Sequence, residues 1–234
     1  MTFFEGIGMY AGYGASMILN GCTISVDKGQ IAVIVGPNGA GKSTAMKALF
    51  GMLPLREGSV YIDSKDITEL RPEQRVLLGM GYVPQTNNVF PSMTVLENLE
   101  MGGFVRRDSL SHTISEIFDL FPILKTKQEQ AAGELSGGQR QQVAVARAMM
   151  TKPNILMLDE PTAGVSPIVM DELFNRIIDI ANTGVAIVMV EQNAKQALQI
   201  ADTGYVLVQG ENKFKDTGTA LLNNPEVRQA FLGG

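Results

Sequence analysis

A continuous run of residues in this 234-residue chain has the composition of a loop that binds phosphate groups. A short β-branched run at residues 31–35 precedes the loop, and helical spacing follows over residues 42–50, with Gly51 placed to end the helix. Glycines let the backbone approach an anion closely, and N–H groups at a helix N-terminus attract it. Lys42 would reach the β- and γ-phosphates of a nucleoside triphosphate, and the Ser43 hydroxyl would ligate Mg²⁺. The sequence therefore predicts a triphosphate site formed by Gly36, Pro37, Asn38, Gly39, Ala40, Gly41, Lys42, Ser43 and Thr44.

Two acidic residues, Asp159 and Glu160, follow an apolar strand predicted at residues 155–158. Asp159 ends this strand at its carboxyl edge, where α/β proteins place their ligands. Its carboxylate can hold part of the Mg²⁺ shell, and Glu160 would face the γ-phosphate. Because a water that attacks phosphorus must be oriented and deprotonated, Glu160 is our candidate general base. Two solvated acids at a strand end are the alternative interpretation.

Between these motifs lies a run that begins a helix predicted at about residues 137–150, and it consists of Leu135, Ser136, Gly137, Gly138 and Gln139. The Ser136 hydroxyl and the following glycine amides would form another anion site at a helix N-terminus. Considered alone, this run is an ordinary serine-capped helix start. However, the triphosphate-binding loop at residues 36–44 (a P-loop), this run, and the strand that ends in Asp159 and Glu160 follow one another in the chain. In that order they resemble the nucleotide-binding subunits of ATP-binding-cassette (ABC) proteins. The resemblance covers nearly the whole chain.

The resemblance implies roles for residues that spacing alone would not identify. In ABC proteins the signature segment, here residues 135–139, faces the γ-phosphate of ATP bound by the opposite subunit, so two chains enclose two ATP molecules. By the same resemblance Gln85 contacts Mg²⁺, senses the γ-phosphate, and lies in a loop that touches the membrane partner. Tyr13 is the aromatic residue expected to stack on adenine, and Tyr10 is the competing candidate.

Two departures from the family pattern affect the expected chemistry. Most relatives carry a histidine after the strand predicted at residues 185–190, where this chain has Gln192. Glutamine can hydrogen-bond the γ-phosphate or position water, but it carries no proton at neutral pH. The single histidine, His112, falls in a predicted helical insertion and is expected to face solvent. Residues 163–166 lack the aspartate that many relatives have there, which predicts altered communication between the two sites. The predicted catalytic residues are thus Glu160, Gln192 and Gln85.

Several strings narrow the resemblance to one branch, the ATPases of importers for branched-chain and other hydrophobic amino acids. These strings lie at residues 97–103, 190–194, 202–207 and 232–234. The chain resembles the shorter, second ATPase subunit of such an importer, which energises uptake by binding and hydrolysing ATP. Importers of urea or short amides remain an alternative. So does a regulatory cassette that binds ATP while a sibling subunit hydrolyses it.

The same resemblance implies the partners. They are a second ATPase subunit (a sibling or a second copy), two integral membrane permease subunits and, indirectly, a periplasmic or extracellular solute-binding protein. The expected location is peripheral, at the cytoplasmic face of the cell membrane. A net charge of −5 argues against nucleic acid as a partner, because phosphate-binding surfaces are usually basic. No apolar run approaches the roughly 18 residues needed to cross a bilayer, so other chains must supply the membrane part.

The alternation of predicted strands and helices favours an α/β fold. We expect a P-loop NTPase core with a mostly parallel sheet and flanking helices, an antiparallel β subdomain, and an inserted helical subdomain at about residues 90–150. One ABC ATPase domain is expected over residues 1–234. The lone Cys22 cannot form an internal disulfide, suits a reducing cytosol, and is expected to be a buried strand residue.

Local patterns predict further elements. An antiparallel strand is expected at residues 58–63, closed by a polar turn at residues 64–66. Two short strands are expected at residues 205–208 and 213–216. Helical turns should follow them and end at Phe231 and Leu232.

Overall fold

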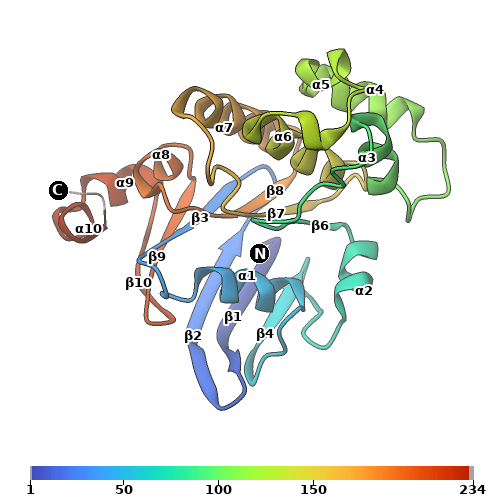
Figure 1. The fold of residues 1–234 in the computed structure, drawn as a ribbon. Coiled ribbons are helices and arrows are strands. Elements are labelled where there is room, and N and C mark those ends of the chain that lie inside the picture. Colours follow the sequence, from blue (N-terminus) through green and yellow to red (C-terminus); the bar gives the residue numbers. More distant parts are fainter. Residues whose placement is uncertain (1, 232–234) are drawn as a thin grey trace.

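The computed structural model describes residues 2–231 and contains two β-sheets with helices packed around them (Figure 1). The strands are β1 (Phe4–Tyr13), β2 (Ser16–Val26), β3 (Ile31–Val35), β4 (Glu57–Ile62), β5 (Lys65–Asp66), β6 (Met80–Val83), β7 (Ile155–Asp159), β8 (Ala186–Val190), β9 (Thr203–Val208) and β10 (Glu211–Asp216). The helices are α1 (Lys42–Phe50), α2 (Pro72–Leu77), α3 (Val95–Gly102), α4 (Ser111–Leu120), α5 (Pro122–Thr126), the 3₁₀ helix η1 (Ala132–Glu134), α6 (Gly137–Met149), α7 (Pro167–Asn182), α8 (Ala194–Gln199), α9 (Gly218–Asn223) and α10 (Pro225–Phe231).

The larger sheet has the strand order β10-β9-β3-β8-β7-β6. Its pairings are parallel except that β10 runs antiparallel to β9. Side chains alternate between the two faces, so Val33 and Val35 join one hydrophobic cluster while Ala32 and Ile34 join the other. Because helices cover both faces, every residue of β3, β7 and β8 is buried. This arrangement confirms the predicted α/β fold with a mostly parallel sheet.

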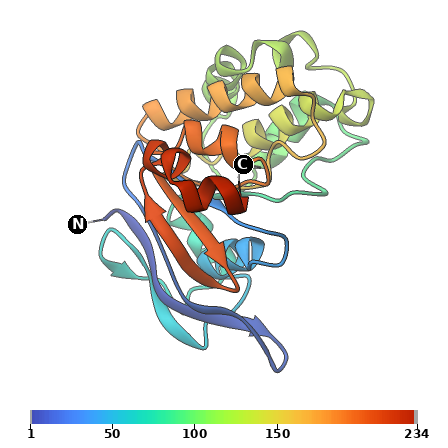
Figure 2. The same ribbon diagram turned by 90° about the vertical axis from the view of Figure 1, so that its left-hand side faces the viewer.

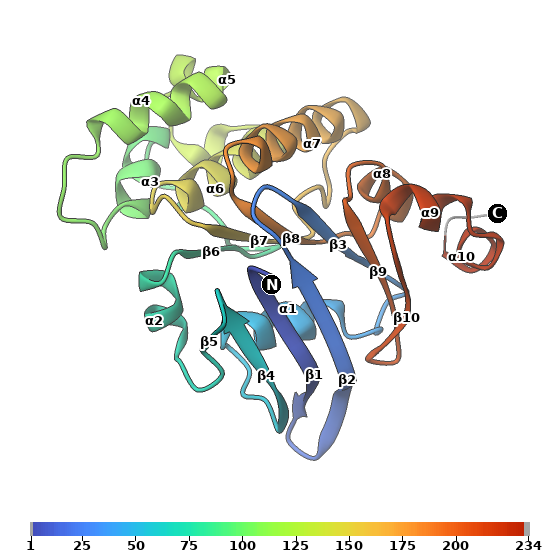
Figure 3. The ribbon, with the colours of Figure 1, turned by 180° about the vertical axis from the view of Figure 1, so that it is seen from behind.

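Helix α1 lies between the two sheets (Figures 1 and 3). Its Met46 and Leu49 are fully buried and pack in one cluster with Phe4 and Leu19 of the smaller sheet. That sheet is antiparallel, with the order β2-β1-β4-β5. Both sheets therefore fix the position of α1, and with it the loop that leads into the helix. The helix predicted at residues 42–50 is confirmed.

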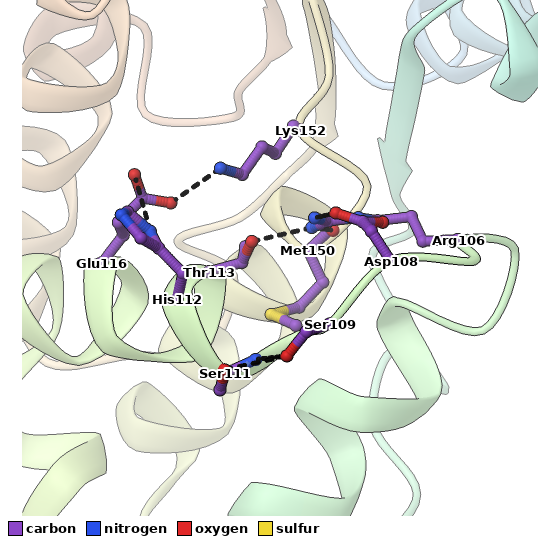
Figure 4. Close-up of polar contacts among 9 residues, drawn as sticks. All are labelled: Arg106, Asp108, Ser109, Ser111, His112, Thr113, Glu116, Met150 and Lys152. Carbon is purple, nitrogen blue, oxygen red and sulfur yellow. Dashed lines mark hydrogen bonds and ion pairs between the residues drawn. The ribbon is translucent and has the colours of Figure 1, made fainter.

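Helices α6 and α7 cover the opposite face of the larger sheet, and Figure 2 shows these layers from the side. The elements from α3 to α6 stand between β6 and β7, in the stretch where the sequence predicts a helical insertion. The segment between α3 and α4 is fastened by Arg106 (Figure 4). One guanidinium nitrogen of Arg106 donates to the Met150 carbonyl over 2.9 Å and to the Thr113 hydroxyl over 2.8 Å, and Asp108 forms an ion pair with Arg106. The segment is thereby attached to the C-terminal end of α6.

His112 projects from α4 into solvent, as expected from the sequence, and its side chain is 80% exposed. Its Nδ1 lies 3.4 Å from one carboxylate oxygen of Glu116, whose other oxygen lies 3.0 Å from Lys152 Nζ (Figure 4). This is a surface cluster, and exposed ion pairs of this kind contribute little to stability.

One expected turn and two expected strands differ from the structure. The prediction of a polar turn at residues 64–66 is wrong, because Asp63 and Ser64 form the turn, with φ of 48° and 64°, and Lys65–Asp66 form β5. A two-residue turn with two positive φ values follows the natural twist of paired strands. Likewise β9 and β10 are longer than expected, and the turn between them uses Gln209 and Gly210. Leu232 and the string at residues 232–234 lie outside the described residues.

Cys22 is fully buried in β2, which confirms the expectation of a strand cysteine. Burial raises the pKa of its thiol to about 12, so this group stays protonated and unreactive at neutral pH. Within residues 2–231, no helix is both long enough and apolar enough to traverse a bilayer.

Candidate functional site

The loop between β3 and α1 curls around the ammonium group of Lys42. Lys42 Nζ donates to the carbonyl oxygens of Gly36 and Pro37 over 2.9 and 3.1 Å, and the residue is only 6% exposed. Burial lowers the pKa of Lys42, against the opposing effect of the nearby carboxylates of Glu160 and Asp159. A cation is thus held at the centre of the loop, supported by backbone carbonyls.

Gly36 is required where the loop leaves β3. Its φ is 151°, and a Cβ atom at this position would lie 2.2 Å from the carbonyl oxygen of Leu207 in β9. Glycine therefore permits the close approach of the loop to the neighbouring strand.

The outer side of the P-loop borders a cavity of about 410 Å³. Its lining consists of Tyr13, Ile18, Asn38, Gly39, Ala40, Gly41, Lys42, Ser43, Thr44 and Glu160. Tyr13 is 48% exposed, and Lys47 Nζ lies 5.9 Å from its ring centroid. Tyr10 packs over Gly21 and is absent from the described lining. Of the two tyrosines considered, the structure brings Tyr13 to the cavity.

Asp159 is buried at the end of β7, where two hydroxyl groups approach its carboxylate. Ser43 Oγ donates to Oδ1 over 3.1 Å, and the Tyr82 hydroxyl donates to Oδ2 over 3.2 Å. Burial and the charge of Asp159 raise the pKa of Tyr82, so this phenol remains a donor at neutral pH. The structure therefore brings the predicted residues Ser43 and Asp159 together and adds Tyr82 to them.

Glu160 follows with a left-handed backbone conformation, φ 49°. Its N–H donates to the Val190 carbonyl of β8 over 2.9 Å, and its carbonyl accepts from Ala163 N–H over 3.1 Å. The side chain is half-buried at the edge of the cavity. Gln85 Nε2 donates to its Oε2 over 2.7 Å. Two of the predicted catalytic residues are thus in direct contact.

The donor set fits a magnesium ion that binds together with phosphate. A hydroxyl from Ser43, a carboxylate from Asp159 and an amide oxygen from Gln85 are all hard oxygen ligands, which Mg²⁺ prefers. Among residues 2–231, no cluster of three or more His, Cys, Asp or Glu side chains is arranged to hold a metal. Mg²⁺ usually takes one or two carboxylates and completes its shell with substrate phosphates and water. The residues present suit this arrangement better than a metal held by protein alone.

A second cavity of about 280 Å³ adjoins the first through Glu160. Its lining consists of Glu160, Thr162, Ala163, Gly164, Val165, Met170, Glu191, Gln192 and Asn193. Gln192 is exposed, and directly before it stands Glu191, which is only 1% exposed. Burial raises the pKa of Glu191 to about 7, although hydrogen bonds from Thr162 and the Gln192 amide oppose this rise. The structure therefore places a titratable acid beside the residue that replaces the usual histidine.

The signature segment begins α6 with a reciprocal cap. Ser136 Oγ accepts from Gln139 N–H over 3.3 Å, and Gln139 Oε1 accepts from Ser136 N–H over 3.1 Å. The amides of Gly137 and Gly138 stand at the helix start, where N–H groups have no partner within the helix. A Cβ atom at Gly138 would lie 2.1 Å from Val169 Cγ1, so glycine lets α6 approach α7.

The signature segment lies apart from the P-loop cavity of the same chain. Among the described residues, none of residues 135–139 lines that cavity. Leu135 is buried in the hydrophobic core, so its side chain anchors the segment. The contact of this segment with ATP of a second chain stays a prediction.

The loop after Gln85 is connected to α6 by buried polar contacts. Asn88 Nδ2 donates to Gln141 Oε1 over 2.7 Å, and both residues are buried. Nearby, the Arg147 guanidinium carbon lies 4.9 Å from the ring centroid of Phe90. The helix that begins with the signature segment is therefore joined directly to the loop that carries Gln85.

Sequence reasoning did not select Ile18, Tyr82, Thr162 or Glu191. Ile18 and Tyr82 had no distinguishing signal, since an apolar or aromatic strand residue is usually core. Glu191 had one: it is a charged residue at the end of an apolar, buried strand, and such residues are seldom buried without a partner.

The fold and the site together define a P-loop nucleotide-binding protein with an acid-tipped strand beside the loop. The sequence profile described as ABC transporter matches residues 19–163. The chain is 41% identical, over the full length of both proteins, to the high-affinity branched-chain amino acid transport ATP-binding protein BraG of Pseudomonas aeruginosa. It is 41% identical over 74% of each chain to the probable branched-chain amino acid transport ATP-binding protein LivF of Archaeoglobus fulgidus.

Solved structures agree with this similarity. The ADP conformation of MJ1267, an ATP-binding cassette of an ABC transporter, has a TM-score of 0.91 and 30% identity, with complete coverage of both chains. The chain belongs to the ABC transporter family, whose ATP-binding cassettes are ATPases. The family predicted from the three motifs is confirmed.

Proposed function

We propose that this chain is the ATP-hydrolysing subunit of an importer for branched-chain amino acids. The hydrolytic part of the proposal depends on one observation, the contact of Gln85 with Glu160 at the edge of the P-loop cavity. The transport part depends on similarity to BraG that extends over the whole of both chains.

The residues that line the two cavities have different proposed roles in ATP binding and hydrolysis. The P-loop amides and Lys42 bind the triphosphate, and the Tyr13 ring stacks on the adenine. Glu160 accepts a proton from the attacking water, whose oxygen forms the new bond to the γ-phosphorus while ADP leaves. Gln85 orients the Glu160 carboxylate, and Gln192 lies on the other side of Glu160 where it can hydrogen-bond the γ-phosphate or the water.

Magnesium, held by Ser43, Asp159 and the Gln85 amide oxygen, would neutralise charge on the phosphates. Tyr82 keeps the Asp159 carboxylate oriented toward Ser43 by occupying its other oxygen.

A second ATPase subunit completes the site. The Gly137 and Gly138 amides form an anion-binding helix start, and none of residues 135–139 lines the P-loop cavity of its own chain within the described part. In the proposed pair, each signature segment contacts the ATP bound to the opposite P-loop. The second chain is a sibling or another copy.

Membrane permease subunits are proposed to bind the segment that follows Gln85. This segment carries four large apolar side chains that are well exposed: Phe90, Met101, Phe104 and Val105. Exposed apolar side chains that lie close together in the chain favour a protein contact in this segment. The chain would therefore lie peripherally at the cytoplasmic face of the membrane, with an external solute-binding protein acting through the permeases.

Uptake measured in cells tests the whole proposal. A strain that lacks the gene should lose uptake of radiolabelled leucine, isoleucine and valine, and the wild-type gene should restore it. Glu160→Gln at equal expression should not restore it, whereas the exposed Glu73→Gln should serve as the matched control with full uptake. Unchanged amino-acid uptake without the gene would contradict the transport assignment, and parallel uptake of urea or acetamide would identify the alternative substrates.

A further inference from the structure

Glu191 contacts three parts of the site, and two of them are distant from it in the chain. Glu191 Oε1 accepts from the Thr162 amide over 3.0 Å, and both oxygens accept from the Thr162 hydroxyl over 2.9 Å. Oε2 also accepts from the Gln192 amide over 3.2 Å. The Glu191 amide donates to the Ile34 carbonyl of β3 over 3.2 Å, immediately before the P-loop. Its side chain thus connects the loop after Glu160 with the Gln192 amide.

These contacts act on the backbone around Glu160. Thr162 lies two residues after Glu160, is buried, and has both its N–H and its hydroxyl directed to Glu191. On the other side, the Glu160 N–H is held by Val190, the residue before Glu191. The left-handed turn at Glu160 is therefore fixed at both ends by two consecutive residues, the last residue of β8 and the one that follows it.

We propose that Glu191 is a positioning residue for ATP hydrolysis, which holds Glu160 and Gln192 at a fixed separation across the second cavity. The proposal rests on the hydrolytic function proposed above. Glu160 and Gln192 are the side chains proposed to contact the attacking water, and Glu191 acts through them.

A purely structural role explains the observations less well. Burying a carboxylate costs several kcal/mol unless its hydrogen bonds compensate, and a neutral residue would fill the same space at lower cost. All of the donors that satisfy Glu191 belong to the two segments that flank the catalytic candidates. The free-energy cost of burying Glu191 is therefore offset by hydrogen bonds that fix the two segments beside the catalytic candidates.

The first experiment compares kinetics of Glu191→Gln, Glu191→Ala and Thr162→Val in the full-length protein. We expect kcat for ATP hydrolysis to fall about 10-fold or more in Glu191→Ala, less in Glu191→Gln, and to a similar extent in Thr162→Val. The Kd for ATP should change less than about twofold, because neither Glu191 nor Thr162 lines the P-loop cavity. Thr162→Ser, which keeps the hydroxyl, should recover most of the rate.

The second experiment is amide hydrogen exchange of the nucleotide-free protein, which needs no turnover. In Glu191→Ala the amides of Thr162 and Gln192 should exchange faster, while the Val188 amide in the centre of β8 should stay as protected as in the wild type. Uniform loss of protection would indicate general destabilisation and would overturn the positioning role.

The outcomes separate the two proposals. If the wild-type protein hydrolyses ATP and kcat is unchanged in Glu191→Ala, Glu191 does not position the site. If the wild type does not hydrolyse ATP even in the assembled transporter, the proposed function fails, while the exchange at Thr162 still decides whether Glu191 holds the loop.

Discussion

Gln85 and Glu160 form a hydrogen bond of 2.7 Å although 75 residues separate them in the chain. The bond uses the donor end of the Gln85 amide, so its oxygen is the atom that would ligate Mg²⁺. A single glutamine can therefore hold Glu160 through its amide nitrogen and leave its amide oxygen for the predicted contact with Mg²⁺. The orientation of the candidate base depends on the loop that carries Gln85.

This contact predicts a selective loss in Gln85→Ala. We expect kcat for ATP hydrolysis to fall roughly 10- to 100-fold, because Glu160 loses the hydrogen bond that orients it. The KM for ATP should change less than kcat, since Gln85 supplies only one of the proposed Mg²⁺ ligands and does not line the P-loop cavity. Steady-state ATPase assays would measure both constants. A rise in KM with unchanged kcat would show that Gln85 acts in binding instead.

Lys42→Ala should weaken ATP binding. Hydrogen bonds to charged groups contribute about 1.5–3 kcal/mol each, so we expect the Kd for ATP to rise roughly 10- to 100-fold. Titration calorimetry would measure this change. The exposed Lys125→Ala on α5 removes the same charge elsewhere and should leave the Kd unaltered. Equal affinity of both variants would contradict the role of Lys42.

Glu160→Gln should bind ATP but not hydrolyse it, and nucleotide should then bridge two chains. Sedimentation velocity with and without Mg-ATP measures this association. A shift from monomer to dimer would show that the signature segment and the P-loop of identical chains complete each other. A persistent monomer that binds ATP would indicate an obligatory sibling subunit.

Gly138→Ala should lower stability through its contact with α7. The added methyl group would lie 2.1 Å from Val169 Cγ1. Overpacking of this kind costs about 1–3 kcal/mol, and each kcal/mol lowers Tm by roughly 2–4 °C in a chain of this size. Thermal unfolding followed by circular dichroism would detect the change. Combining it with Val169→Ala should restore the Tm, whereas an additive loss would contradict the proposed steric cause.

Glu191 should make stability depend on pH. Burial, with a smaller contribution from the charge of Glu160, raises the pKa of Glu191 from 4.5 to about 7. The folded state therefore binds a proton that the unfolded state has released between these values, so the contribution of Glu191 to stability is greatest below pH 4.5 and declines as the pH rises to about 7. At about 1.36 kcal/mol per pH unit, the decline amounts to roughly 3 kcal/mol.

Urea unfolding of the wild type and Glu191→Gln at several pH values would measure the contribution of Glu191. It is the difference between the two proteins in the free energy of unfolding. That difference should shift in favour of the variant as the pH rises. A difference that does not vary with pH would mean that Glu191 has an ordinary pKa.

The sequence predicted those parts of the site that local spacing determines. The P-loop lies within a few residues of α1, and the serine cap of α6 depends on four consecutive residues, so both were accessible to pattern reasoning. Tyr82 and Asp159 meet across 77 residues, and Thr162 and Glu191 across 29. These contacts exist because β7 lies between β6 and β8, and neighbouring strands of a parallel sheet cannot be read from spacing alone.

The boundaries of the helices and strands also differ in how well the local sequence predicts them. The limits of α1 followed from the P-loop at one end and Gly51 at the other. The turn before β5 was misplaced because Asp63 and Ser64 take positive φ values that no glycine announces.

The buried pair of Asn88 and Gln141 has a mechanical consequence. Its 2.7 Å bond cannot stretch far before both side-chain amides lose their partner, and each unsatisfied buried group costs about 1–3 kcal/mol. Helix α6 and the loop behind Gln85 are therefore expected to move together. A displacement of this helix would then shift the loop that carries Gln85 through the Asn88–Gln141 bond.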